Sequence, residues 1–139
     1  MKISAKKALA NVKADRKEYK NLINAVISRV SLDSVEDICA HGINGGFGGF
    51  IYYADTIKFF DRYRADILRL LKDQADDLGE KPIEMALSFN CFDSDCETAI
   101  GQFVYGGKMT ADETQQVKNG FAWFAAEEVC RWIVDEMGY

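Results

Sequence analysis

The chain has 139 residues, of which 48% are hydrophobic, and its 22 acidic and 17 basic side chains give a formal net charge of -5. This length supports a core without disulfides or metal, but it is short for two domains of about 100–200 residues each, which predicts a single domain over residues 1–139. The first residues lack the apolar core of a signal peptide, and no stretch has the roughly 20 apolar residues of a membrane span, so we expect a cytoplasmic protein.

The N-terminal segment has a helical pattern. Ser4 can cap a helix that runs to about Ser31, because apolar residues recur there mostly at three- and four-residue steps. Between Val12 and Tyr19, however, the pattern has no large apolar member and contains four consecutive charged residues. Two interpretations stay open: one long helix, or two helices that meet within residues 15–20.

A glycine-rich segment follows a second helix signal. Ser34, with Asp37 three residues later, can open a short helix that ends near Gly42. Residues 41–50 then hold five glycines, a density that argues against helix because glycine loses the most backbone entropy on folding. The aromatic residues 50–53 fit either one short strand or the start of a helix.

Asp55 or Thr56 can cap the clearest helix of the chain. Its apolar face runs as far as Leu78, and Gly79 stands just beyond, where helices commonly end. Pro82 suits the first turn of another helix, since its missing N–H would have no partner in that turn anyway.

Two capping boxes predict the last two helices. One is formed by Ser94 and Glu97, and the other by Thr110 and Glu113. We therefore predict an all-α or helix-dominated α+β fold, with about six helices and at most one short strand.

The cysteines and the single histidine do not form a recognisable metal or catalytic motif. A zinc site would need the thiolates of Cys39, Cys91 and Cys96 with His41, but the spacings are unlike those of known zinc motifs. We expect these thiols and that of Cys130 to be reduced and mostly buried, with no metal, no cofactor and no catalytic residues.

The glycine-rich segment is an alternative site. A small enzyme or ligand-binding protein could place polar groups there beside an aromatic wall, provided that a concave pocket exists. The candidate residues are His41, Asn44, Tyr52, Tyr53 and Asp55.

Charge is divided unevenly along the chain. Residues 1–20 hold seven basic and two acidic side chains, a net charge of +5, whereas residues 73–139 hold 14 acidic and four basic side chains, a net charge of -10. Either segment can be a solvated surface or a surface for a partner of opposite charge. The acidic candidates are Asp73, Asp76, Asp77, Glu80, Asp93, Asp95 and Glu97, and the basic candidates are Lys6, Lys7 and Lys13.

Residues 45–60 have the sequence Gly-Gly-Phe-Gly-Gly-Phe-Ile-Tyr-Tyr-Ala-Asp-Thr-Ile-Lys-Phe-Phe. This segment resembles a family of small uncharacterised accessory proteins carried by bacteriophages and mobile elements. The similarity covers chiefly residues 41–90. The resemblance implies a phage or mobile-element origin and, because small proteins of this origin often act against host defence, an anti-CRISPR role.

The charge division, the lack of a catalytic set and the resemblance together predict a non-enzymatic protein-interaction module. It would inhibit a host defence complex, a protein or ribonucleoprotein in the bacterial cytoplasm, by binding its surface. Direct nucleic-acid binding through the N-terminal lysines is a further alternative. Trp123, Phe124 and Trp132 fit a core at helical spacing, and they also fit a homodimer interface.

Overall fold

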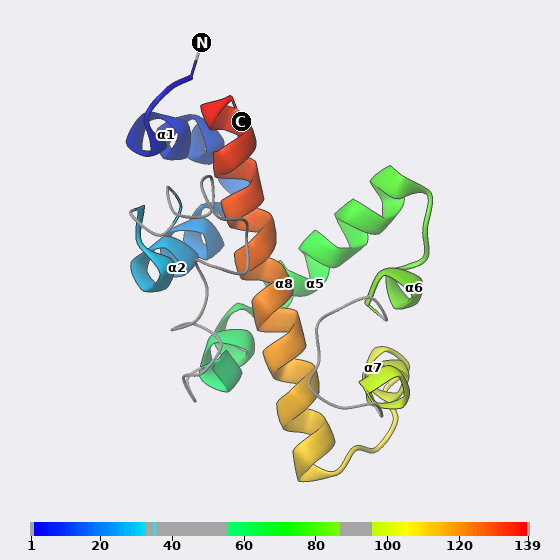
Figure 1. Ribbon diagram of the computed structural model, residues 1–139. Coiled ribbons are helices and arrows are strands. Elements are labelled where there is room, and N and C mark those ends of the chain that lie inside the picture. The colour runs from blue at the N-terminus through cyan, green and yellow to red at the C-terminus, as the bar shows by residue number, and fades with distance from the viewer. Residues whose placement is uncertain (1, 33–34, 36–55, 87–95, 139) are drawn as a thin grey trace. The chain divides into compact units, whose positions relative to one another are not determined.

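The computed structural model describes residues 2–32, 35, 56–86 and 96–138 (Figure 1). Within these ranges the chain forms six α-helices and one 3-10 helix, and no strand. The predicted helix-dominated fold class is therefore confirmed. The predicted helix from Ser34, the glycine-rich segment, the aromatic residues 50–53 and the Ser94 cap lie outside the described residues.

The described helices belong to two units. The first unit contains α1 (Ala5–Asp15), the 3-10 helix η1 (Lys17–Tyr19), α2 (Lys20–Val30) and the part of α8 (Ala111–Met137) that starts at Ala125.

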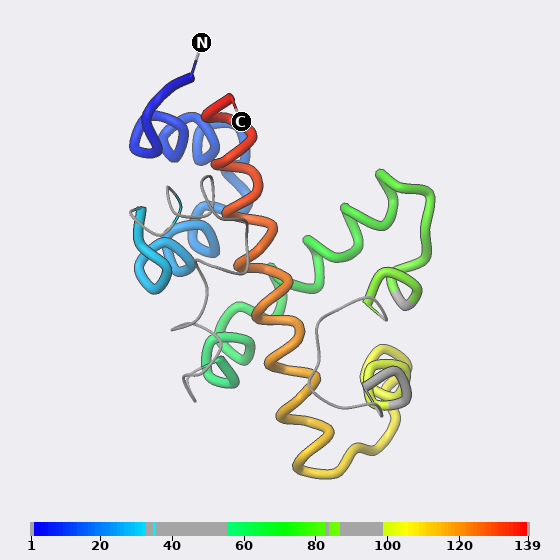
Figure 2. Tube along the Cα trace, viewed as in Figure 1, coloured from blue at the N-terminus to red at the C-terminus, as the bar shows by residue number. Residues whose placement is uncertain are grey.

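The predicted break between the first two helices is present (Figure 2). The Ser4 hydroxyl caps α1 by accepting the Lys7 N–H at 3.2 Å. Arg16 then leaves the helical conformation, with φ -126° and ψ 58°, while its N–H still donates to the Val12 carbonyl. The interpretation with two helices is therefore correct, and the one with a single long helix is wrong.

The start and the end of the chain meet in this unit (Figure 1). The Ile3 N–H donates to the Met137 carbonyl at 3.1 Å, and the Asn11 amide donates to the Glu136 carboxylate at 3.1 Å. The buried apolar residues described in the unit are Ala5, Ala8, Val12, Tyr19, Leu22, Ile23, Ala25, Val26, Val30, Val35, Ala125, Ala126, Val129, Cys130, Ile133 and Met137.

The second unit contains α5 (Thr56–Leu78), α6 (Pro82–Ala86), α7 (Cys96–Val104) and α8 as far as Phe124. The predicted start and end of the long central helix are thus confirmed, as is the place of Pro82 at the first position of a helix. The helix α5 is kinked at Tyr63, where φ is -108° and ψ is 19°.

A cluster of three phenylalanine rings holds the second unit together. The centroids of Phe60, Phe103 and Phe121 lie 5.1–5.7 Å from one another, at the tilted or edge-on angles that aromatic pairs prefer. Phe60 and Phe121 are completely buried. Because one ring comes from each of α5, α7 and α8, the cluster joins these three helices.

Candidate functional site

An acidic surface lies at the end of α5. We define it as Asp73, Asp76, Asp77 and Glu80, which are all exposed. Their spacing of three and four residues places these carboxylates along one side of the helix and of the turn that follows it.

The position of these carboxylates does not favour the helix. The helix macrodipole carries partial negative charge at its C-terminal end, so carboxylates there are unfavourable by about 0.3–1 kcal/mol each. The last turn of α5 contains no basic residue to compensate for Asp76 and Asp77. Helix stability therefore gives no reason for the charges of Asp76 and Asp77 at this end of α5.

The turn after α5 adds an exposed apolar side chain to the acidic surface. Gly79 has φ +67°, and the Glu80 N–H donates to the Ala75 carbonyl at 2.8 Å, which is the hydrogen bond of a Schellman cap. Leu78, the last residue of the helix, is 64% exposed. Acidic groups and an exposed apolar side chain thus lie together at the C-terminal end of α5.

The other acidic candidates from the sequence are not included in this definition. Asp93 and Asp95 lie outside the described residues. Glu97 is the second residue of α7, and its side chain is not among those described.

The basic candidates lie on α1. Lys6 and Lys7 are exposed, whereas Lys13 is half-buried and donates from its Nζ to the Asn24 side-chain oxygen at 3.1 Å. Part of the hydrogen-bonding capacity of Lys13 is therefore used to join α1 to α2, which leaves Lys6 and Lys7 as the more accessible cations.

The alternative site at the glycine-rich segment, with His41, Asn44, Tyr52, Tyr53 and Asp55, lies outside the described residues. So do Cys39 and Cys91.

The one cysteine side chain that is described is buried. Burial, together with the negative charge of Glu127, raises the pKa of the Cys130 thiol to about 12. The thiol is therefore protonated at neutral pH, and a protonated thiol is neither a nucleophile nor a good metal ligand. Within residues 2–32, 56–86 and 96–138, no three His, Cys, Asp or Glu side chains gather as a metal site would require.

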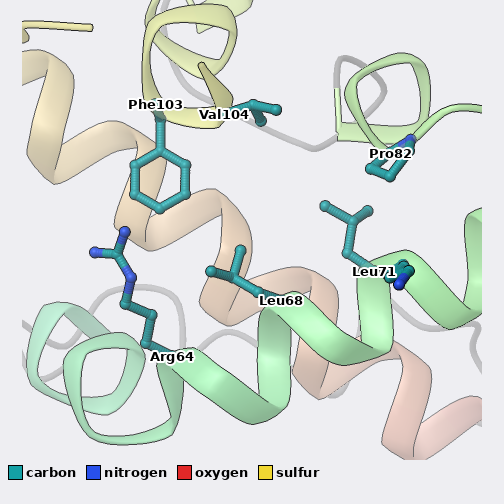
Figure 3. A pocket seen from close by; sticks show the side chains of 7 residues that line it. Arg64, Leu68, Leu71, Pro82, Phe103 and Val104 are labelled. Carbon is teal, nitrogen blue, oxygen red and sulfur yellow. The ribbon is translucent and has the colours of Figure 1, made fainter. Parts of the chain in front are cut away.

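The second unit contains a small pocket that sequence reasoning did not find. Its volume is about 250 Å³, and Figure 3 shows Phe103 and Val104 of α7 on one side and Leu68 and Leu71 of α5 on the other. In the described part of the chain, the lining consists of Arg64, Leu68, Leu71, Lys72, Pro82, Phe103 and Val104.

Two cations belong to this mostly apolar lining. The Arg64 guanidinium lies 4.9 Å from the centroid of the Phe103 ring and 5.8 Å from that of Phe60. In the described part of the chain, the side chains of Arg64 and Lys72 form neither an ion pair nor a hydrogen bond.

A helical projection of α5 shows which of its residues share the side that lines the pocket. Arg64, Leu68, Leu71 and Lys72 are spaced by four, three and one residues, which places them on one side of the helix. The sequence does not show that Pro82 and the end of α7 lie opposite this side, because those contacts depend on how the chain folds back.

No helix in the described part of the chain is both long enough and apolar enough to span a bilayer. A family model described as "Domain of unknown function (DUF7222)" matches residues 9–139. No curated protein and no solved structure matches the chain.

Proposed function

The chain belongs to the DUF7222 family, and we propose that it is a non-enzymatic protein-interaction module whose acidic surface binds a positively charged partner. The acidic surface carries this proposal. Two of its four exposed carboxylates, Asp76 and Asp77, stand in the last turn of α5, where the helix macrodipole disfavours them, beside the exposed Leu78. A positively charged partner that neutralises these carboxylates would explain why they occupy positions that weaken their own helix.

The partner would be a host defence complex of a bacterium, and the protein would inhibit it in the manner of an anti-CRISPR protein. Complexes that hold nucleic acid present basic surfaces, which an acidic protein surface can occupy. The resemblance of residues 45–60 to phage and mobile-element accessory proteins supports this setting.

The experiment is affinity capture from a bacterial lysate at low salt, with three versions of the full chain. The first is the natural sequence, and the second carries Asp73→Asn, Asp76→Asn, Asp77→Asn and Glu80→Gln. The third is a matched control that removes four exposed carboxylates elsewhere, by the changes Asp15→Asn, Glu84→Gln, Asp112→Asn and Asp135→Asn.

We expect the natural chain and the control to retain the same nucleic-acid-binding complex, and the acidic-surface variant to lose it. Retention should also fall as salt rises, because exposed charges are screened beyond about 8–10 Å at physiological ionic strength. Equal capture by all three versions would refute the proposal, and so would a partner whose retention does not respond to salt.

A further inference from the structure

The pocket of the second unit has the size of a small organic molecule. An apolar cavity of about 150 Å³ accommodates benzene, and pockets for drug-sized ligands begin near 300 Å³. The volume of about 250 Å³ therefore corresponds to one aromatic ring with a short side chain, or to an alkyl chain of similar size. The side chains of Leu68, Leu71, Pro82, Phe103 and Val104 provide an apolar wall for such a group.

Arg64 is arranged to receive a carboxylate. A guanidinium group that lies over an aromatic ring uses its face for that contact, and its N–H donors point outward from its edges. The Arg64 side chain makes ring contacts with Phe60 and Phe103, and no described residue accepts a hydrogen bond from its guanidinium donors. The same donors match the two oxygens of a carboxylate in a bidentate arrangement.

Lys72 adds a second positive charge to the same lining, whose described residues include no acidic one. Two other basic side chains of this unit are paired with carboxylates, Arg69 with Asp66 at 2.8 Å and Lys118 with Asp61 at 2.7 Å. The pocket is thus a local positive site in a chain of net charge -5, which favours an anionic ligand over a cationic one.

From the volume, the apolar wall and the two cations, we propose that this pocket binds a small amphiphilic carboxylate. The apolar part of the ligand would lie between α5 and α7, and its carboxylate would pair with Arg64. This inference does not depend on the proposed protein-interaction role, because the pocket and the acidic surface share no residue.

The test uses phenylbutyrate as the probe, in a titration of the full chain followed by amide NMR. Phenylbutylamine, which has the same ring and linker with the opposite charge, is the matched ligand control. We expect saturable shifts of the amides around Leu68 and Val104 with the carboxylate, and binding at least about tenfold weaker with the amine, since a hydrogen bond to a charged group would be lost.

Variants of two arginines test whether the ligand's carboxylate pairs with Arg64. We expect Arg64→Gln to weaken phenylbutyrate binding at least about tenfold, and Arg62→Gln, which removes the same charge from an exposed position outside the lining, to leave it unchanged. Arg64→Gln could also disturb the aromatic cluster. Lys72→Gln changes an exposed residue of the lining that has no part in this cluster, and we expect it also to weaken phenylbutyrate binding.

Three results would overturn the inference: equal affinity for the amine and the carboxylate, no effect of either pocket variant, or shifts that map elsewhere. Capture of the host partner is measured separately, so failure of this ligand site and failure of the proposed function remain distinguishable.

Discussion

The guanidinium of Arg16 lies 4.5 Å from the ring centroid of Trp132, in cation–π contact with a residue near the other end of the chain. Arg16 is also the residue at which the helical conformation stops between α1 and η1. The Tyr19 ring lies 5.8 Å from the same indole. The break between the two N-terminal helices therefore brings a cation and an aromatic ring against α8.

We predict that Arg16→Met lowers the free energy of unfolding by about 0.5–1 kcal/mol, the size of a cation–π contact that remains partly accessible to water. Urea unfolding followed by circular dichroism measures the change. Lys17→Met, at the exposed neighbouring position, should change stability little. Equal losses in the two variants would show that the contact with Trp132 contributes nothing.

The capping box at the start of α8 gives a second prediction. The Glu113 N–H donates to the Thr110 hydroxyl at 3.1 Å, and the Thr110 N–H donates to the Glu113 carboxylate at 2.9 Å. Thr110→Ala should cost about 1 kcal/mol of stability, whereas Thr110→Ser keeps the hydroxyl and should be nearly neutral. Thermal or urea unfolding of the two variants decides the matter, and an alanine variant as stable as the serine one would contradict the prediction.

Carboxylates at opposite helix ends should respond oppositely to neutralisation. Asp77→Asn, in the last turn of α5, should stabilise the protein, and Asp112→Asn, in the first turn of α8, should destabilise it, each by about 0.3–1 kcal/mol. Both changes remove one exposed negative charge, so an effect of net charge alone would have the same sign in the two variants. Urea unfolding at low salt separates these cases.

The end of α2 is strained. Ser31 has φ 73° and ψ 156°, a conformation that is adopted almost only by glycine. We predict that Ser31→Gly is about 1 kcal/mol more stable than Ser31→Ala, since both variants lose the hydroxyl and only alanine keeps the unfavourable Cβ. Equal stability of the two variants in urea would mean that the backbone here relaxes without cost.

The buried thiol of Cys130 makes stability depend on pH in the alkaline range. Its pKa is raised from 9.0 to about 12 by burial first and by Glu127 second, so its contribution to stability is complete below pH 9 and is lost as pH rises toward 12. Between pH 8 and pH 10, the natural chain should lose about 1.4 kcal/mol more than Cys130→Ala. Urea unfolding of both proteins under reducing conditions, at both pH values, measures this difference. Identical pH dependence would contradict the prediction.

Local signals in the sequence predicted the helices well. Ser4, Gly79 and Pro82 act through hydrogen bonds or dihedral angles within a few residues, so their effects can be read without knowledge of the rest of the fold. The charged run after Val12 likewise predicted the break at Arg16, because it interrupts the apolar stripe that a continuous helix would bury.

The sites were less predictable for a physical reason. The acidic surface was found because Asp73, Asp76 and Asp77 are close in sequence, whereas the pocket is assembled from three helices. The cation–π contact of Arg64 with Phe103 joins residues of α5 and α7, and no spacing rule reports such a distance. The sequence also offered candidate residues in the glycine-rich segment, but these lie outside the described residues.

The hydrogen bond from Ile3 to Met137 has a consequence for synthesis of the chain. The unit that contains α1 and α2 needs residues 125–137 of α8, which are synthesised about 100 residues later, so the apolar faces of α1 and α2 must wait for their partner. The unit of α5, α6 and α7 is contiguous in sequence as far as Phe124 and can be completed earlier. In a growing chain, α1 and α2 are thus made before the second unit and are covered after it.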